Sequence, residues 1–196
     1  MLKQDLDLYY HSGEYFTEPI KHPTIEGKTF SIDDTLYIVF YASYGFYDYL
    51  MNFTFPKIHL VADKRYKAHM GFVLHYDNIK SSIEDRFYES QCSKVHIIGY
   101  SQGASIALLC AYYLSKIVSP TVVCFEPLAI SNSSLKEYLE KNCDIQYTKY
   151  GNDTVTKLLF WNRHVGTEHH FGPKKVWWKF CNKDHPLENI KKIFQN

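Results

Sequence analysis

The segment from Val95 to Ser115 constrains the fold more than any other part of the chain. Residues 95–99 form a short apolar run rich in β-branched side chains, and residues 102–115 are apolar nearly all round. The first pattern is typical of a strand covered on both faces, and the second of a buried helix. A strand that turns within three residues into a buried helix predicts a layered α/β fold.

The same alternation recurs on both sides of this segment. Phe72, Tyr76, Ile79, Ile83 and Phe87 repeat at three- and four-residue steps, which predicts one amphipathic helix over residues 71–88. Further patterns predict strands over 36–41, 121–125 and 145–150, and a helix over 132–141. Strands that alternate with helices indicate a mostly parallel central sheet with helices on both faces.

The C-terminal segment, residues 164–196, shows a different pattern. Residues 164–171 and 174–180, joined at Gly172-Pro173, predict a hairpin at the sheet edge, where a proline is tolerated. A final helix is expected after Asp184, with Pro186 at an early position and Leu187, Ile190 and Phe194 on one face.

Composition limits the class of protein. With 196 residues and 45% hydrophobic content, we expect one domain spanning residues 1–196. The 22 Lys and Arg against 21 Asp and Glu give no field that would attract nucleic acid. No stretch has the apolar length of a signal peptide or membrane span, so we expect a cytoplasmic chain without stable membrane insertion. Five cysteines, odd in number and without CxxC spacing, indicate reduced and mostly buried thiols.

Ser101 is the first candidate for chemistry. It occupies the centre of Gly99-Tyr-Ser-Gln-Gly103, which fits the pattern G-x-S-x-G between a predicted strand and a predicted helix. In that context the serine is displayed on a sharp turn as a nucleophile, at a helix N-terminus that stabilises an oxyanion. The alternative is an ordinary glycine-flanked turn with a solvated serine.

A nucleophilic serine needs a histidine and a carboxylate, which in this kind of fold follow later in the chain. Asp153 lies in a turn-rich segment directly after a predicted strand, although it could equally be a simple turn former. Among the late histidines we favour His185, which precedes the final helix. His164, His169 and His170 lack cysteine or acidic ligands at zinc spacing, so we expect no metal and no cofactor.

Four stretches together resemble the class 3 (fungal-type) lipases of the α/β-hydrolase superfamily. Phe40–Ser43 with Asp48–Phe55 resembles the family's oxyanion loop and lid, and His69–Tyr76 resembles its H-x-G-F-x-x-x-Y segment. Val95–Ala107 is similar to the nucleophile strand, turn and helix, while Asn152–Val155 and Asp184-His185 are similar to the segments of the acid and the histidine. The match runs from about residue 36 to 190.

The resemblance implies roles for individual residues. It makes Ser101 the nucleophile, Asp153 the orienting acid and His185 the general base, and it makes Ser43 and Gln102 the oxyanion donors through their backbone N–H groups. It also implies an aromatic lid and substrate region, for which a surface helix with its apolar side packed down is the alternative. The residues of this region are Tyr44, Phe46, Tyr47, Tyr49, Leu50, Phe53 and Tyr100.

The implied activity is that of a lipase or esterase on lipid or small acyl esters, with phospholipase A1-like action as one form. A catalytically silent lipase-like binding domain and an acyltransferase remain alternatives. Some residues depart from the family pattern: Tyr100 replaces the usual histidine, Ala42 replaces a glycine, and no proline follows Asp153 at the usual place. Acyl-chain length, head group and oligomeric state are not readable from the sequence, and contact with a lipid interface is expected to be transient.

Overall fold

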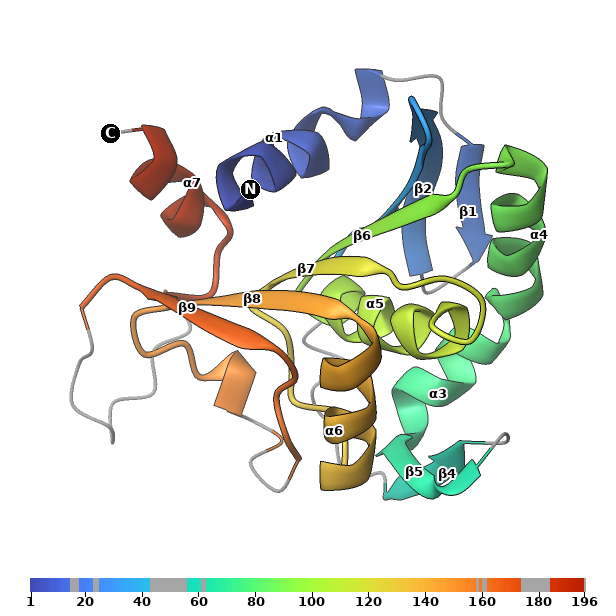
Figure 1. Ribbon diagram of the computed structural model, residues 1–196. Coiled ribbons are helices and arrows are strands. Elements are labelled where there is room, and N and C mark those ends of the chain that lie inside the picture. Colours follow the sequence, from blue (N-terminus) through green and yellow to red (C-terminus); the bar gives the residue numbers. More distant parts are fainter. Residues whose placement is uncertain are drawn as a thin grey trace.

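A seven-stranded sheet forms the centre of the molecule (Figure 1). The structure, a computed structural model, describes residues 1–14, 18–22, 25–42, 56–60, 63–157, 159, 162–173 and 184–195. The strand order is β1-β2-β3-β6-β7-β8-β9; the first three strands pair antiparallel, and the strands from β3 to β9 pair parallel. The strands are β1 Glu18–His22, β2 Ile25–Ile32, β3 Thr35–Phe40, β6 Lys94–Tyr100, β7 Thr121–Phe125, β8 Asp144–Tyr150 and β9 Thr167–Phe171.

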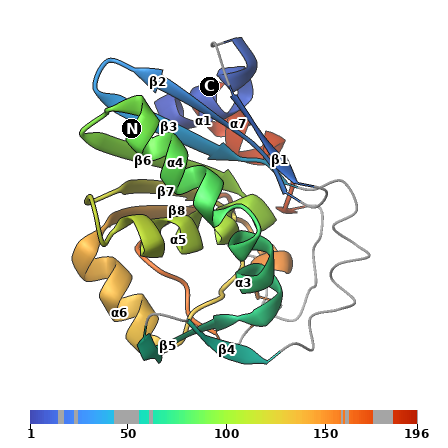
Figure 2. The ribbon, with the colours of Figure 1, turned by 90° about the vertical axis from the view of Figure 1, so that its right-hand side faces the viewer.

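Helices cover both faces of this sheet, as the sequence predicts (Figures 1 and 2). Helices α1 and α7 lie on one face, and α3, α4, α5 and α6 lie on the other. The helices are α1 Leu2–His11, α3 Met70–Asp77, α4 Lys80–Ser90, α5 Gln102–Leu114, α6 Ser133–Asn142 and α7 Glu188–Gln195. The predicted mostly parallel α/β fold is therefore confirmed.

Side chains that point alternately to the two faces of the central strands divide the core in two. Ile97 of β6 packs with α5, whereas the next residue, Ile98, packs with Leu6 of α1 and Ile190 of α7. Successive side chains of a strand point to opposite faces, so a continuously apolar strand serves both layers. Neither Ile97 nor Ile98 is exposed to solvent. The apolar run found in the sequence thus holds helices on both sides of the sheet.

The prediction of one continuous helix over residues 71–88 is wrong. Residues 71–88 belong to two helices, α3 and α4, which are separated by a turn at Asn78-Ile79. The Asn78 side chain donates to the Leu74 carbonyl at 2.9 Å, a local hydrogen bond that competes with continued helix. Phe72 and Ile83 are nevertheless buried in the same core, because the break preserves the apolar face.

Several elements have no counterpart in the sequence predictions. These are α1, β1, β2 and the small two-stranded sheet of β4 (Lys57–Leu60) and β5 (Asp63–His69). The first arm of the predicted C-terminal hairpin is β9, which pairs with β8 at the sheet edge, while residues 174–180 lie outside the described residues. Among the described helices, none has the length and apolar character needed to cross a membrane.

Candidate active site

Ser101 occupies the sharp turn between β6 and α5. Its backbone has φ 55° and ψ −116°, a conformation that residues other than glycine rarely adopt. Its N–H donates to the Phe125 carbonyl at 2.9 Å, which ties the turn to the end of the neighbouring strand β7. Such strain persists only where surrounding structure fixes it, and it is common at functional sites.

The two glycines of the turn are required by close backbone approaches. A Cβ atom on Gly99 would lie 2.6 Å from the Ala104 Cα, and one on Gly103 would lie 2.4 Å from the Phe40 carbonyl oxygen. Any side chain at either position would therefore push α5 away from β6 or from β3. The G-x-S-x-G spacing thus brings the strand and helix together tightly enough to hold Ser101 in its strained conformation.

The predicted triad residues come together in a hydrogen-bonded series. The Ser101 Oγ lies 2.8 Å from the His185 Nε2, and the His185 Nδ1 lies 2.8 Å from the Asp153 Oδ2. With the proton on Nδ1, the imidazole donates to Asp153 and accepts from the Ser101 hydroxyl. Ser101 and Asp153 are almost completely buried, at 1% and 2% exposed. The three side chains form a Ser-His-Asp triad.

The Asp153 carboxylate is held by its own loop. Its Oδ1 accepts a hydrogen bond from the Val155 N–H at 2.8 Å, which leaves Oδ2 directed at His185. Asp184 supports the preceding turn, because its Oδ2 accepts from the Asn152 N–H at 2.8 Å. Gly151 is needed there: its φ is +55°, and a Cβ would lie 2.6 Å from the Asp184 Oδ2. Asp184 is therefore a support of the acid loop, and Asp153 is the hydrogen-bond partner of the histidine.

Tyr100, which precedes the serine, contacts both the ring and the backbone of His185. Its ring stacks on the His185 imidazole with centroids 5.4 Å apart, and its hydroxyl donates to the His185 carbonyl at 2.9 Å. Burial raises the pKa of the Tyr100 phenol, so the hydroxyl keeps its proton and remains a donor. Tyr100, which the sequence assigns to the substrate region, thus contacts the histidine and also lines the cavity described below.

Glu126 is a close neighbour that the sequence analysis missed. Its Oε2 lies 3.6 Å from the His185 Nδ1, and the side chain is completely buried. Burial, and next the negative charge of Asp153, raise the pKa of Glu126 to about 10. A signal was present in the sequence, since an acidic residue directly follows the apolar strand 121–125. That position is the carboxyl end of a parallel strand, where ligands and reacting groups gather.

Carboxyl and imidazole atoms of Glu126, Asp153 and His185 lie within 4.8 Å of one another, close enough to surround a metal ion. Both ring nitrogens of His185 already have protein partners, Ser101 and Asp153. A metal at this place would compete with the Ser101–His185–Asp153 hydrogen bonds. The cluster therefore fits proton transfer better than metal binding.

The other predicted site residues have different outcomes. Gln102 is buried as the first residue of α5, directly after Ser101, where the first turn of a helix leaves backbone N–H groups without intrahelical partners. Ser43 lies outside the described residues, as do Tyr44, Phe46, Tyr47, Tyr49, Leu50 and Phe53. The predicted oxyanion loop is thus described only up to Ala42, and the lid prediction remains a prediction.

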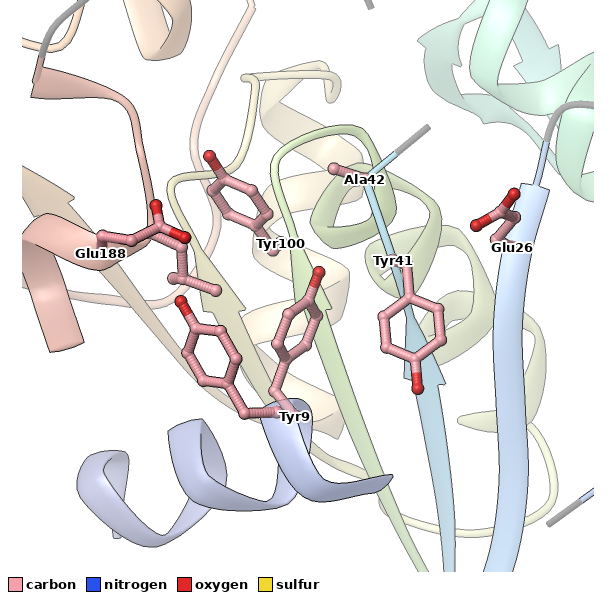
Figure 3. A pocket seen from close by; sticks show the side chains of 8 residues that line it. Tyr9, Glu26, Tyr41, Ala42, Tyr100 and Glu188 are labelled. Atoms are coloured by element: carbon pink, nitrogen blue, oxygen red, sulfur yellow. The ribbon is translucent and has the colours of Figure 1, made fainter. Parts of the chain in front are cut away.

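A cavity of about 450 Å³ lies on the face covered by α1 and α7. Figure 3 shows Tyr9 and Tyr100 on one side of it, with Glu188 beyond them, and Tyr41 and Glu26 across from Tyr100. The lining residues are Tyr9, Tyr10, Glu26, Tyr41, Ala42, Tyr100, Leu187 and Glu188. Tyr100 precedes Ser101, and Leu187 follows His185 by two positions. The cavity therefore borders the segments that carry the triad.

A mostly parallel sheet, a serine on a strained strand-to-helix turn, and a buried acid and histidine on later loops define an α/β hydrolase. The family model described as "Lipase (class 3)" matches residues 37–163, more than half of the chain. The chain belongs to the class 3 lipase family, as the sequence resemblance predicts. No curated protein matches the chain closely enough to count as a relative.

Solved structures of lipases share this fold. The lipase from Rhizopus microsporus var. chinensis superposes with a TM-score of 0.71 at 18% identity, covering 86% of this chain and 74% of that one. The triacylglyceride lipase of Rhizomucor miehei gives a TM-score of 0.68 at 21% identity, with 79% and 66% covered. A triacylglycerol lipase whose structure is described as having a serine protease triad at its catalytic centre gives 0.70 at 22% identity, with 84% and 70% covered.

Proposed function

We propose that the protein is a serine carboxylic-ester hydrolase with Ser101 as nucleophile, His185 as general base and Asp153 as orienting acid. One observation carries the proposal: two hydrogen bonds of 2.8 Å connect these three side chains in series. A serine hydroxyl becomes a useful nucleophile only when an imidazole removes its proton, and the imidazole needs a carboxylate to fix its tautomer. Membership in the class 3 lipase family supports ester hydrolysis as the reaction.

The geometry supports a two-step reaction through an acyl-enzyme. The Ser101 Oγ attacks the ester carbonyl carbon while its proton passes to the His185 Nε2, and Asp153 stabilises the resulting imidazolium. The tetrahedral intermediate collapses, His185 donates the proton to the leaving alcohol, and the acyl group stays on Ser101. A water molecule then attacks the acyl carbonyl, with His185 as base again, and the released acid restores the free serine.

The negative oxygen of the tetrahedral intermediate needs donors at a fixed place. The Gln102 N–H is one candidate, because it belongs to the first residue of α5 and follows the nucleophile directly. The positive end of the helix dipole adds to its effect. The Ser43 N–H is the second candidate, on the loop that follows β3, and it rests on the resemblance to the family.

The substrate is proposed to be a lipid or small acyl ester, and phospholipase A1-like action is one form of this activity. A panel of p-nitrophenyl esters from acetyl to oleoyl, run beside diacyl phospholipids, would separate a simple esterase from a lipase or phospholipase. Release of the sn-1 fatty acid from a phospholipid would support the A1-like form. Added glycerol or lysophospholipid that diverts the acyl group into a new ester would instead identify an acyltransferase.

Substitution of the nucleophile tests the proposal directly. We expect Ser101→Ala to abolish turnover of p-nitrophenyl esters and labelling by a fluorophosphonate probe, because both require the serine oxygen. Asp153→Asn should lower kcat by about 10²- to 10⁴-fold, since the imidazole loses the partner that fixes its tautomer. A wild-type protein that neither turns over esters nor reacts with the probe would identify a catalytically silent lipase-like domain.

We propose that the protein works in a reducing, cytoplasmic compartment and contacts a lipid interface only transiently. We also propose that it needs no cofactor. Cys92, Cys110, Cys124 and Cys143 are free and buried, which supports a reducing compartment. Burial raises the pKa of the Cys110 thiol to about 12, so this cysteine stays protonated and is not a competing nucleophile.

A further inference from the structure

Glu126 occupies an unfavourable position that packing alone does not explain. It directly follows β7, has φ 50° and is 0% exposed. Positive φ is strained for a residue with a Cβ, and a buried carboxyl group is costly unless it is paired. Neither Glu126 oxygen makes a hydrogen bond of good geometry within the described part of the chain, although the Tyr150 backbone lies close enough to offset part of the rise in its pKa.

The backbone on both sides of Glu126 is tightly fixed. The Glu126 N–H donates to the Thr148 carbonyl of β8 at 3.0 Å, and the Phe125 carbonyl accepts from the Ser101 N–H at 2.9 Å. The residue is therefore tied both to the strand before the acid loop and to the nucleophile turn. Its side chain is buried between the elements that carry Ser101 and Asp153.

The carboxyl group lies on the same side of the imidazole as Asp153. Its Oε2 is 3.6 Å from the His185 Nδ1, whereas the Asp153 Oδ2 is 2.8 Å from the same atom. The first distance exceeds the upper end of the ordinary N–H···O range by about 0.4 Å. A small rotation of the Glu126 side chain would bring its oxygen into hydrogen-bond range.

Two buried carboxyl groups this close hold one negative charge between them at neutral pH. Glu126 keeps its proton, because burial, the charge of Asp153 and the more distant charges of Asp184 and Glu188 all raise its pKa, to about 10. The phenol of Tyr100, whose pKa is also raised, adds no charge to this surrounding. Glu126 is thus a neutral neighbour of the Asp153 carboxylate.

We propose that Glu126 is a positioning residue for His185, a second acceptor for the Nδ1 proton that takes over when the Asp153 carboxylate is lost. In the intact protein the neutral carboxyl group fills the space behind the imidazole and restricts its movement. When Asp153 is replaced by alanine, the neighbouring negative charge disappears, so the pKa of Glu126 falls and it loses its proton to solvent more readily. The ionised carboxylate can then accept from Nδ1.

A double-mutant cycle tests this inference, which rests on the proposed ester hydrolysis. The variants are Asp153→Ala, Glu126→Gln and the double mutant, with kcat and KM measured on one p-nitrophenyl ester. Glu126→Gln should lower kcat only about two- to threefold with KM little changed, because glutamine keeps the shape of the neutral carboxyl group that restricts the imidazole. At pH 9, where Glu126 ionises in Asp153→Ala, the double mutant should be at least about tenfold slower than the product of the two single effects, since no carboxylate then remains beside the His185 Nδ1.

The pH profile separates an acceptor from a structural role. In Asp153→Ala, kcat/KM should rise between pH 7 and pH 10 as Glu126 ionises, and this rise should be absent from the double mutant. Asp184→Asn is the matched control, because that carboxylate bonds the Asn152 N–H and not the imidazole. Asp153→Ala/Asp184→Asn should keep the rise. Equal profiles for Asp153→Ala and the double mutant would overturn the inference.

A measurement without substrate distinguishes this inference from the proposed function. The His185 Nδ1 proton can be observed by ¹H–¹⁵N NMR, in all four proteins, as a downfield signal when it is bonded to a carboxylate. We expect the signal in wild type and, above about pH 8, in Asp153→Ala, but not in the double mutant. Its absence from Asp153→Ala at every pH would overturn the role of Glu126, even if the wild type hydrolyses esters. Thermal unfolding of each variant verifies that it is folded.

Discussion

At the scale of single residues, Tyr100 is a further contact that holds the His185 imidazole in place. Its hydroxyl donates to the His185 carbonyl, and its ring stacks on the imidazole. Tyr100→Phe keeps the ring but removes a hydrogen bond worth about 0.5–1.5 kcal/mol. We expect kcat to fall about 2- to 10-fold with KM unchanged, measured on p-nitrophenyl esters. Tyr88→Phe, at a residue 64% exposed, is the control, and an equal loss there would contradict the role of Tyr100.

The buried Glu126 carboxyl group also makes stability depend on pH. Its pKa is about 10 in the folded protein against an ordinary 4.5, so the folded state holds one more proton between these values. Its stabilising effect is complete below about pH 4.5 and is lost as the pH rises through 10. For this one group the free energy of unfolding falls by up to about 1.4 kcal/mol per pH unit in that window.

Glu126→Gln removes this titration, so its free energy of unfolding should fall less steeply with pH than that of the wild type between pH 5 and 10. Urea denaturation at pH 5, 7 and 9 measures the difference. The same slope in both proteins would mean that Glu126 is not held protonated in the folded state.

The sequence identifies the triad because each member carries a recognisable local pattern. Ser101 lies in a strand-turn-helix context, and His185 and Asp153 follow in the order that the α/β-hydrolase fold requires. Glu126 carries a weaker signal: it directly follows a buried strand, but an acidic residue at such a place usually begins a solvated loop. Only the parallel pairing of β7 with β6 and β8 places it behind His185. The role of Tyr100 was missed for the same reason, since its contacts join residues 85 positions apart.

At the scale of elements, the approach of α5 to β3 and β6 determines the shape of the nucleophile turn. A Cβ on Gly103 would lie 2.4 Å from the Phe40 carbonyl oxygen and 2.6 Å from that of Tyr41. Both contacts are with backbone, which cannot rotate away. We expect Gly103→Ala to lower the free energy of unfolding by about 1–3 kcal/mol or more and to reduce activity more than stability explains.

Gly13→Ala is the control for this substitution, because a Cβ there meets only the flexible end of Lys28, at 3.1 Å. Chemical denaturation and ester turnover measure both variants. A Gly103→Ala protein with wild-type stability and activity would show that the turn tolerates a wider separation of helix and strand.

Elements with strong periodicity are predicted well, and those without it are missed. Residues 121–125 are a strand as predicted, and the helix over 132–141 is α6, whose Asn132 side chain caps it by accepting from the Leu135 N–H at 3.0 Å. The short strand β1 contains a proline and mixed polarity, so it carries no period-two signal. The division of 71–88 into two helices was not predictable, because the apolar spacing continues across the turn at Asn78-Ile79.

At the scale of the whole molecule, the sheet needs a covering layer on both faces, and α1 provides much of one. Leu6 is 1% exposed and belongs to the core formed with Ile98 and Ile190. Leu6→Ala should therefore lower the free energy of unfolding by about 2–5 kcal/mol, measured by urea denaturation. Lys3→Ala, on an exposed position of the same helix, should have little effect. Equal effects of the two substitutions would mean that α1 is not part of the core.

The limits of the family match have a practical consequence for anyone who expresses part of this chain. The match spans residues 37–163, but α1 and β2 lie before it, and His185 lies after it. A fragment trimmed to those limits would lack His185 and would expose to water the apolar face of β3, β6 and β7 that α1 and α7 cover. Such a fragment would aggregate, and its lack of esterase activity would say nothing about the intact enzyme.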